Sequence, residues 1–228
     1  MPALDVKSSF CNSLEELVDA CANFYRENED KMRLRNIRER RADLSSFVES
    51  FHKDCGTLTP AVQKRIEDLK NDCVILMTAH QPNLFAYSGV FRKATLNFVL
   101  AKRLERLLGV PVVNFFGVAD QDFTDDRWVK SSLLPAVKRR EGVLAIEIKL
   151  PKMLMLNRVP KPSMDLLNGW KGMIERWLND AVNSVDRFCK VNGLSRLGSK
   201  KPLLRGNFGS FWKMVEDAYE RCTTYSDF

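Results

Sequence analysis

Histidine is scarce in this chain, and its cysteines are scattered. Only two of the 228 residues are histidine, and the six cysteines form no C-x-x-C pair. The chain therefore offers few ligands for a zinc site made of cysteine and histidine, and no metal site is predicted. The patterns G-x-x-x-x-G-K-[ST], G-x-G-x-x-G and H-E-x-x-H are missing as well. No standard nucleotide-binding or metalloprotease motif is present.

The chain also lacks a long uncharged hydrophobic run. Stretches such as residues 110–119 are far shorter than the about 20 residues that cross a bilayer. The first residues show no positively charged segment followed by an apolar one, so no signal peptide is expected. We therefore expect a cytoplasmic protein with no membrane partner.

Positive charge is in excess and is unevenly placed. Lys and Arg number 36 against 29 Asp and Glu, which gives a formal charge of +7. Residues 1–72 carry 12 basic and 14 acidic side chains, a net charge of −2, whereas residues 73–228 carry 24 and 15, a net charge of +9. An anionic ligand or a nucleic acid would therefore meet the second part more readily.

Three helices are predicted in the first third of the chain. Apolar residues at helical spacing follow a capping box at Ser13, and a second helix is indicated over residues 37–51. The charged run Arg33–Arg41 is expected on the solvated side of this second helix. Thr59 and the proline after it open a third helix. We expect residues 1–72 to form a helical N-terminal region.

Strand and helix patterns alternate in the middle of the chain. The continuous apolar run over residues 73–77 is typical of a strand buried on both faces of a parallel sheet, and residues 110–118 form another such run. Apolar spacing predicts a helix over residues 91–108 that ends at Gly109. Strand, helix and strand form a βαβ unit, which should be right-handed with parallel strands.

Helices dominate again in the last part. A strand with one wet face is predicted over residues 143–150 and a long amphipathic helix over residues 166–188. Another helix begins at Phe208, and the basic segment Gly198–Pro202 before it is expected to be a solvated loop. The chain stops at Phe228 soon after this helix, which suggests the front half of a larger enzyme.

These patterns predict an α/β protein in two regions. Residues 1–72 form the helical N-terminal region, and residues 73–228 form a parallel sheet core followed by further helices.

Polar residues follow both predicted strands of the βαβ unit. His80-Gln-Pro-Asn83 comes after the first strand and Asp120-Gln-Asp122 after the second. In open α/β sheets, ligands bind beyond the carboxyl ends of the strands. We therefore expect these two loops to face each other across one crevice.

The first loop and the helix after it offer groups for a polar or anionic substrate. The ring of His80 suits stabilisation of negative charge, or proton transfer near neutral pH. Gln81 and Asn83 supply amides that orient a substrate. Arg92 and Lys93 stand in the first turns of the next helix, where an anion also meets the positive end of the helix dipole.

The second loop offers two carboxylates. Asp120 and Asp122 fit a catalytic pair that binds an amine, or Mg²⁺ together with nucleotide phosphates, and Gln121 is expected to contact substrate. Plainer interpretations stay open at this stage. The two aspartates also fit helix caps, as Asp125 and Asp126 do, and His80 also fits a packed loop residue.

Several short motifs of this middle part also fit a known pattern. They are Thr78-Ala-His-Gln81, Leu84-Phe85, Arg92-Lys93, Val110-Pro-Val112 and Asp120-Gln-Asp-Phe123. Through them the stretch from Val74 to Phe123 resembles the bacillithiol biosynthesis cysteine-adding enzyme family. The first loop also resembles the WbqC-like family. That likeness rests on His80-Gln-Pro82, Gly89, Phe91 and Lys93.

The resemblance implies a Rossmann-like core similar to that of nucleotidyltransferases, with an inserted helical subdomain and, in full-length members, a C-terminal coiled coil. It also implies that cysteine is added to the amino group of glucosaminyl-malate to form an amide. Two residues depart from the family pattern: His80 replaces the first Gln of the loop, and Gln121 replaces a His.

The leading hypothesis is therefore an amide-forming ligase or transferase. Its expected partners are a small amino acid and an amino-sugar or other amine, with ATP or ADP and Mg²⁺ as the cofactors to test, and with homodimers in a full-length chain. Two alternatives stay open. One is a nucleotidyltransferase-like enzyme, and the other is a basic, non-enzymatic RNA-binding module, although no aromatic-rich RNA-binding signature supports it.

Overall fold

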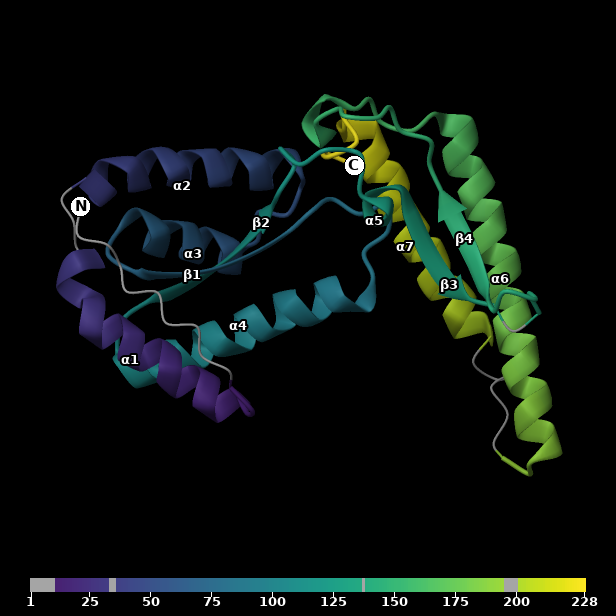
Figure 1. Cartoon of the computed structure of the whole chain (residues 1–228), viewed down its shortest axis with the longest axis horizontal. Coiled ribbons are helices and arrows are strands. Elements are labelled where there is room, and N and C mark those ends of the chain that lie inside the picture. The colour runs from purple at the N-terminus through teal and green to yellow at the C-terminus, as the bar shows by residue number, and fades with distance from the viewer. Residues whose placement is uncertain (1–10, 33–35, 137, 195–200) are drawn as a thin grey trace. The chain divides into compact units, whose positions relative to one another are not determined.

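The computed structural model describes residues 11–32, 36–136, 138–194 and 201–228 (Figure 1). Apart from the short elements α5, β3 and η1, the helices and strands follow the predicted order, with three helices before the first strand. The elements are α1 (Leu14–Met32), α2 (Asn36–Asp54), α3 (Pro60–Lys70), β1 (Val74–His80), α4 (Ser88–Leu108), β2 (Val112–Val118), α5 (Arg127–Lys130), β3 (Ser131–Pro135), β4 (Val143–Glu147), the 3₁₀ helix η1 (Leu156–Arg158), α6 (Met164–Val191) and α7 (Lys201–Arg221).

Contacts divide the chain into two compact units. Unit 1 consists of Met1–His80 and Ser88–Gly117, and unit 2 of Gln81–Tyr87 and Val118–Phe228. The three N-terminal helices thus share a unit with β1, α4 and most of β2. The domain division at residue 72 that the sequence predicts stays a prediction, and the helices do give way to β1 at that place.

Local side-chain contacts start the helices of unit 1. Before α1, the backbone N–H of Glu16 donates to Ser13 Oγ at 3.1 Å, and the Glu16 carboxylate accepts from the N–H of Asn12 at 2.7 Å. Thr59 Oγ1 accepts from the N–H of Val62 before α3, and Pro60 occupies the first helical position. These contacts satisfy N–H groups that have no partner inside the helix.

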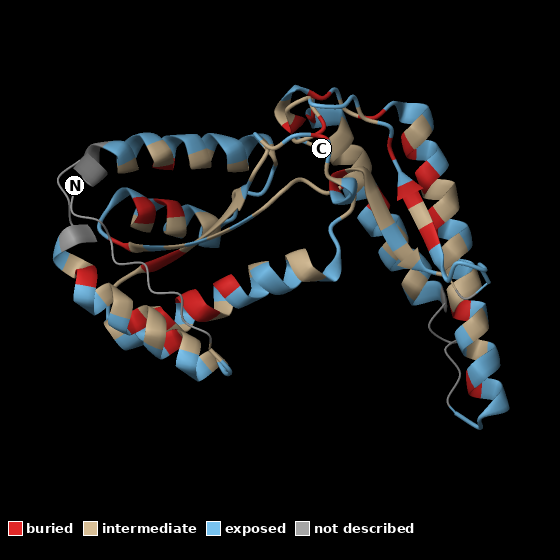
Figure 2. Cartoon of the chain, in the orientation of Figure 1, coloured by how far each residue is buried: buried red, intermediate tan, exposed pale blue. Residues whose placement is uncertain are grey.

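β1 and β2 form a two-stranded parallel sheet joined through α4, as the sequence predicts (Figure 1). Gly109 ends the connection after α4 with φ +68°, a left-handed conformation that glycine adopts without steric cost. The buried residues of α4 all lie from Asn97 onward (Figure 2). This part of the helix packs with α1 and the start of β2 in one apolar cluster.

Two expectations for β1 are wrong. The strand extends to His80, so Thr78, Ala79 and His80 belong to the strand and not to the loop. Its side chains alternate between half-buried and exposed, with 63% of the Met77 side chain accessible. Successive side chains of a strand point to opposite faces, and only one face of β1 is packed among the described residues.

Arg41 corrects the expectation for the charged run before α2. Residues 33–35 of that run lie outside the described residues. Arg41, however, is half-buried and donates to the carbonyl oxygens of Leu69, Asn71 and Cys73 at 3.4, 3.1 and 2.8 Å. Its guanidinium therefore binds the end of α3 and the chain that leads into β1, where carbonyl groups lack helical partners.

Unit 2 contains an antiparallel hairpin that the sequence indicates only in part. β3 pairs with β4 in the register Ser131↔Glu147 to Pro135↔Val143. The sequence indicates the second strand through its alternation but not the first. In the structure β4 ends at Glu147, so the predicted strand over residues 143–150 is three residues too long.

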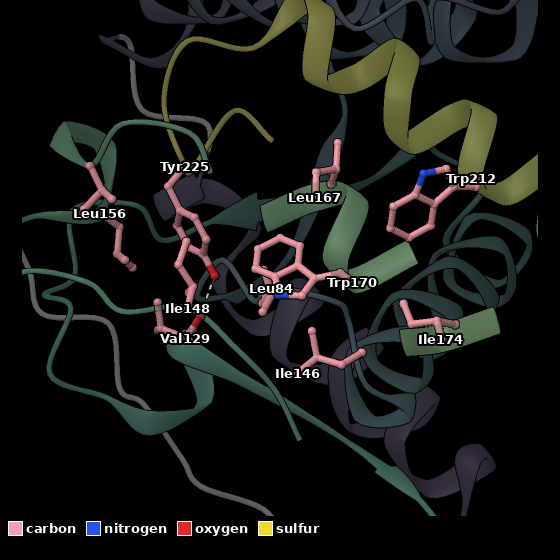
Figure 3. Close-up of a cluster of buried hydrophobic side chains, with 11 residues drawn as sticks. Leu84, Val129, Ile146, Ile148, Leu156, Leu167, Trp170, Ile174, Trp212 and Tyr225 are labelled. Carbon is pink, nitrogen blue, oxygen red and sulfur yellow. Dashed lines mark hydrogen bonds between the residues drawn. The ribbon is translucent and has the colours of Figure 1, made fainter. Parts of the chain in front are cut away.

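A single large apolar cluster supports unit 2 (Figure 3). Trp170 of α6 and Trp212 of α7 belong to it, and Ile146 enters it from β4. Tyr225 lies in the segment after α7, and its hydroxyl donates to the Val129 carbonyl, as the dashed line in Figure 3 shows. The last residues of the chain therefore pack onto the same core as α5.

α6 and α7 differ from their predicted starts. Ser163 caps α6, because its Oγ accepts from the N–H of Leu166, and α6 runs to Val191. α7 begins at Lys201, seven residues before the predicted start. Residues 198–200 of the predicted basic loop lie outside the described residues, while Lys201 and Pro202 belong to the helix.

The predicted fold class is confirmed: a mixed α/β chain with a parallel strand pair, a helical N-terminal region and further helices after the core. Among the described helices, none is both long enough and apolar enough to cross a membrane.

Candidate functional site

The acidic turn after β2 is fastened to the segment before α6. Phe123 and Met155 form an antiparallel bridge, and the backbone N–H of Leu156 donates to the Asp122 carbonyl at 2.9 Å. Thr124 is fully buried, and its hydroxyl donates to the Pro151 carbonyl. Buried polar groups need partners, and this pairing supplies them. The turn is thus held in one shape by its own neighbours in unit 2.

The loop after β1 meets this acidic turn. Gln81 Nε2 donates to Asp122 Oδ2 at 2.7 Å, across 41 residues of sequence. Both residues belong to unit 2, and both are half-buried. The sequence predicts that the two polar loops lie together, and for Gln81 and Asp122 the structure shows this contact directly.

Asp120 and Gln121 complete the turn. The Asp120 carboxylate is half-buried and makes no hydrogen bond or ion pair with any residue that the structure describes, while Gln121 is exposed. The Asp120 carbonyl accepts from the N–H of Asn157 at 3.0 Å. A half-buried carboxylate without a cation of its own is suited to an ammonium group supplied by a ligand.

Asn83 anchors the first loop to unit 2. Its Nδ2 donates to the Trp128 carbonyl at 3.0 Å, and Phe85 and Ser132 exchange hydrogen bonds two residues further on. The buried Oδ1 of Asn83 has no hydrogen-bond partner in the described part of the chain. Asn83 therefore positions the loop, and its oxygen remains as an acceptor.

The apolar cluster of Figure 3 includes residues from the loop after β1, from α5 and from η1. The loop after β1 contributes Leu84, α5 contributes Val129, and η1 contributes Leu156, which is fully buried. Leu84 directly follows Asn83, and Leu156 directly precedes Asn157. Burial of these apolar residues thereby fixes the position of the polar residues next to them in the sequence.

His80, Arg92 and Lys93 belong to unit 1. His80 is the last residue of β1 and is half-buried. Arg92 and Lys93 are exposed and lie in the second turn of α4, because that helix begins at Ser88. The dipole effect of a helix falls off within its first turn, so the predicted support from the helix N-terminus is weaker than expected.

The capping interpretation of the acidic turn holds for one aspartate. Asp126 Oδ1 accepts from the N–H of Trp128 at 2.8 Å and so caps α5. Asp125 instead accepts from the N–H of Met153 at 3.4 Å. Asp120 and Asp122 cap no helix, which leaves their carboxylates for another role.

Asn157 is a site residue that sequence reasoning missed. Its backbone binds Asp120, and its buried Oδ1 has no hydrogen-bond partner among the residues described. No motif surrounds it, since it follows Met153–Leu156, a short apolar stretch. Only the pairing of that segment with the acidic turn reveals it.

The side chains of the site offer few ligands for a metal ion. Within the described ranges, no three His, Cys, Asp or Glu side chains gather where they would hold one ion. Asp120 and Asp122 would therefore bind Mg²⁺ only with ligands from a bound phosphate, whereas an ammonium needs no further protein ligand.

These features define a class: an α/β protein whose βαβ unit leads from both strands into polar loops, one of them acidic. The model of the family Bacillithiol biosynthesis BshC, N-terminal Rossmann-like domain, matches residues 5–130, more than half of the chain, and the chain belongs to this family. The match covers every predicted site residue. A comparison with curated proteins finds no significant match.

Proposed function

We propose that this chain takes part in forming an amide between an amino acid and the amino group of a small amino-sugar acceptor. The family match supports a role in bacillithiol biosynthesis. The observation that carries the proposal is the hydrogen bond from Gln81 to Asp122, because it joins the two polar loops at a carboxylate.

The acidic turn suits recognition of the acceptor amine. In this proposal Asp120 and Asp122 bind the ammonium form, and Gln81 occupies one oxygen of Asp122 and so fixes the direction of the other. Charge-assisted hydrogen bonds of this kind are short and about twice as strong as neutral ones. Gln121, Asn83 and Asn157 then contact the neutral polar groups of the substrate.

Amide formation also requires proton transfer. The ammonium loses a proton before its nitrogen attacks the acyl carbon of the amino acid. A C–N bond forms, and the C–O bond between that carbon and the phosphate-bearing group that activates it breaks, so this group leaves with the electron pair of that bond. A carboxylate beside the amine accepts such a proton when it lies within hydrogen-bond distance. We assign this step to Asp120, whose carboxylate is not committed to any described residue.

His80, Arg92 and Lys93 keep the roles proposed from the sequence. His80 would stabilise developing negative charge or move a proton, and the two cations would hold an anionic group of the amino acid or of its activating group. The His80→Asn variant tests the first role, because it keeps a polar side chain and removes the imidazole ring. A selective loss of turnover with retained binding supports it.

A thermal-shift experiment tests the proposal. Cysteine, glucosaminyl-malate, ATP and ADP are added singly and in pairs, with and without Mg²⁺, to the wild-type chain and to Asp120→Asn, Asp122→Asn and Asp125→Asn. The last variant is the matched control, since Asp125 is exposed and lies in the same turn.

The proposal expects glucosaminyl-malate to raise the melting temperature of the wild-type chain and of the control. It expects the shift to disappear in Asp120→Asn and Asp122→Asn. If no compound shifts the wild-type chain, or if all four proteins respond alike, the acidic turn is not the acceptor site.

A further inference from the structure

Unit 2 contains a pocket of about 290 Å³ that is separate from the acidic turn. Pro135 at the end of β3 lines it together with Lys138 and Arg139 of the turn between β3 and β4, the hairpin labelled beside α6 in Figure 1. Arg176, Trp177 and Asp180 line it from α6 at a spacing that places them on one helix face. All these residues lie outside residues 5–130, the stretch that matches the family.

Two contacts hold the walls of this pocket in place. The indole Nε1 of Trp177 donates to the Pro135 carbonyl at 2.7 Å, which fixes the plane of the ring. Lys138 pairs with Asp180 across the same gap. Leu144 forms an apolar part of the lining and is 6% exposed. The pocket is therefore formed in advance of any ligand, with an aromatic wall.

Its charge is strongly positive. Asp180 balances Lys138, but within the described parts of the chain neither the Arg139 nor the Arg176 guanidinium has an ion-pair partner. Arg139 and Arg176 therefore line an aromatic-walled cavity without an acidic partner among the described residues. Guanidinium binds phosphate and carboxylate through paired N–H groups and also stacks on flat rings.

We propose that this pocket binds a small organic anion that carries a flat apolar group, of the size of an aromatic phosphate monoester. The volume lies just below the roughly 300–1,000 Å³ range of small-molecule sites, which suits a single ring and one anionic group. The ring packs on Trp177 and Leu144, and Arg139 and Arg176 bind the anion.

Calorimetric titration at pH 8 with three probes tests the proposal. Phenyl phosphate carries both the ring and the charge, inorganic phosphate carries the charge alone, and benzyl alcohol carries the ring alone. We expect saturable binding of phenyl phosphate, binding of phosphate at least tenfold weaker, and no measurable binding of benzyl alcohol.

Variants assign the binding to this pocket. The double variant Arg139→Gln/Arg176→Gln should weaken phenyl phosphate binding at least tenfold. Arg26→Gln is the matched control, since Arg26 is an exposed arginine of α1 in unit 1. Trp177→Leu should reduce the preference for phenyl phosphate over phosphate. Circular dichroism checks that each variant keeps its helices.

Two outcomes overturn the proposal. One is a wild-type chain that binds phenyl phosphate no better than inorganic phosphate. The other is a double variant with the same affinity as Arg26→Gln. Both outcomes are independent of the acidic turn, so the proposed function stands or falls separately.

Discussion

The two units of this chain hold their elements together by different means. Among the described residues, unit 2 has one cluster of eleven buried residues that includes two tryptophans and a tyrosine, whereas unit 1 has separate clusters of six and three. In unit 1, arginines supply long-range links. Arg41 binds carbonyl groups at the end of α3, and Arg65 forms two hydrogen bonds with Glu105 at 2.8 and 2.9 Å.

This difference predicts which kind of substitution destabilises each unit most. Apolar burial supplies most of the stability of a core, so unit 2 should respond most to a loss of side-chain volume. Where apolar clusters are small, polar contacts contribute a larger share of the stability. The stability of unit 1 should therefore fall when a guanidinium group is lost. Substitutions at Trp212, Arg41, Tyr225 and Glu105 test this contrast.

Trp212→Ala should give the largest loss. Trp212 is 1% exposed and contacts the rings of Phe85 and Phe208. Truncation of a buried aromatic residue leaves a cavity and typically costs about 4 kcal/mol of unfolding free energy. Chemical denaturation followed by near-UV circular dichroism measures it.

Trp212→Phe is the matched control for that variant. The indole Nε1 of Trp212 is buried and has no hydrogen-bond partner among the residues described. Phenylalanine keeps a ring and removes this unsatisfied donor, so the loss should be less than half that of Trp212→Ala. Equal losses in both variants would contradict the view that ring volume stabilises unit 2.

Arg41→Met should destabilise unit 1 by about 2 kcal/mol, since it leaves the carbonyl groups of Leu69 and Cys73, whose hydrogen bonds are half-buried, without a charged donor. Methionine keeps much of the apolar stem. Arg40→Met provides the comparison, because Arg40 is the exposed neighbour on the same helix. Urea denaturation followed by far-UV circular dichroism measures both. If the two variants are equally stable, Arg41 adds nothing beyond a solvated charge.

Tyr225→Phe should cost about 1 kcal/mol at neutral pH through the lost hydrogen bond to the Val129 carbonyl. Burial raises the pKa of the Tyr225 hydroxyl well above its usual value. The folded state thus prefers the neutral phenol, and this contribution is fully present below about pH 10, the usual pKa of tyrosine.

Above that pH the wild-type chain should lose stability relative to Tyr225→Phe. The difference should grow by up to about 1.4 kcal/mol for each pH unit, because the unfolded chain releases the proton first. Thermal melts from pH 8 to pH 11 measure it. Parallel curves for the two proteins would show that Tyr225 does not control the alkaline limit.

Glu105→Gln should have the smallest effect. Arg65 and Glu105 are both about one-third exposed, and their pairing lowers the pKa of Glu105 through the hydrogen bonds from the guanidinium. Exposed ion pairs of this kind contribute about 0.5 kcal/mol and are screened by salt. The difference from wild type should therefore shrink in 1 M NaCl. A large loss that persists at high salt would instead indicate a packing role.

The order of the elements could be predicted from sequence because their signals are local. Capping residues, helical apolar spacing and Gly109 place α1, α3 and α4 to within a few residues. The exposure of one face of β1 could not be predicted, since a continuous apolar run does not show whether both faces of a strand are packed. β3 was missed because Ser131-Ser-Leu-Leu-Pro135 shows no alternation of apolar and polar residues.

The candidate site shows the same limit. Gln81 and Asp122 could be predicted together, because loops after neighbouring parallel strands share one edge of a sheet. Asn157 could not, since its contact with Asp120 depends on a bridge between segments about thirty residues apart. The pocket beside α6 could not be predicted for the same reason, because Arg139 and Arg176 line one pocket only after the hairpin packs on the helix.

The most direct test of the account compares two forms of one acceptor. Calorimetry measures the binding of glucosaminyl-malate and of its N-acetylated form, which lacks the ammonium charge, to the wild-type chain and to Asp122→Asn. If the acidic turn recognises the acceptor amine, the wild-type chain binds the free amine at least tenfold more tightly, and Asp122→Asn loses that preference. Equal binding of both forms by the wild-type chain, or binding of neither, would contradict the account.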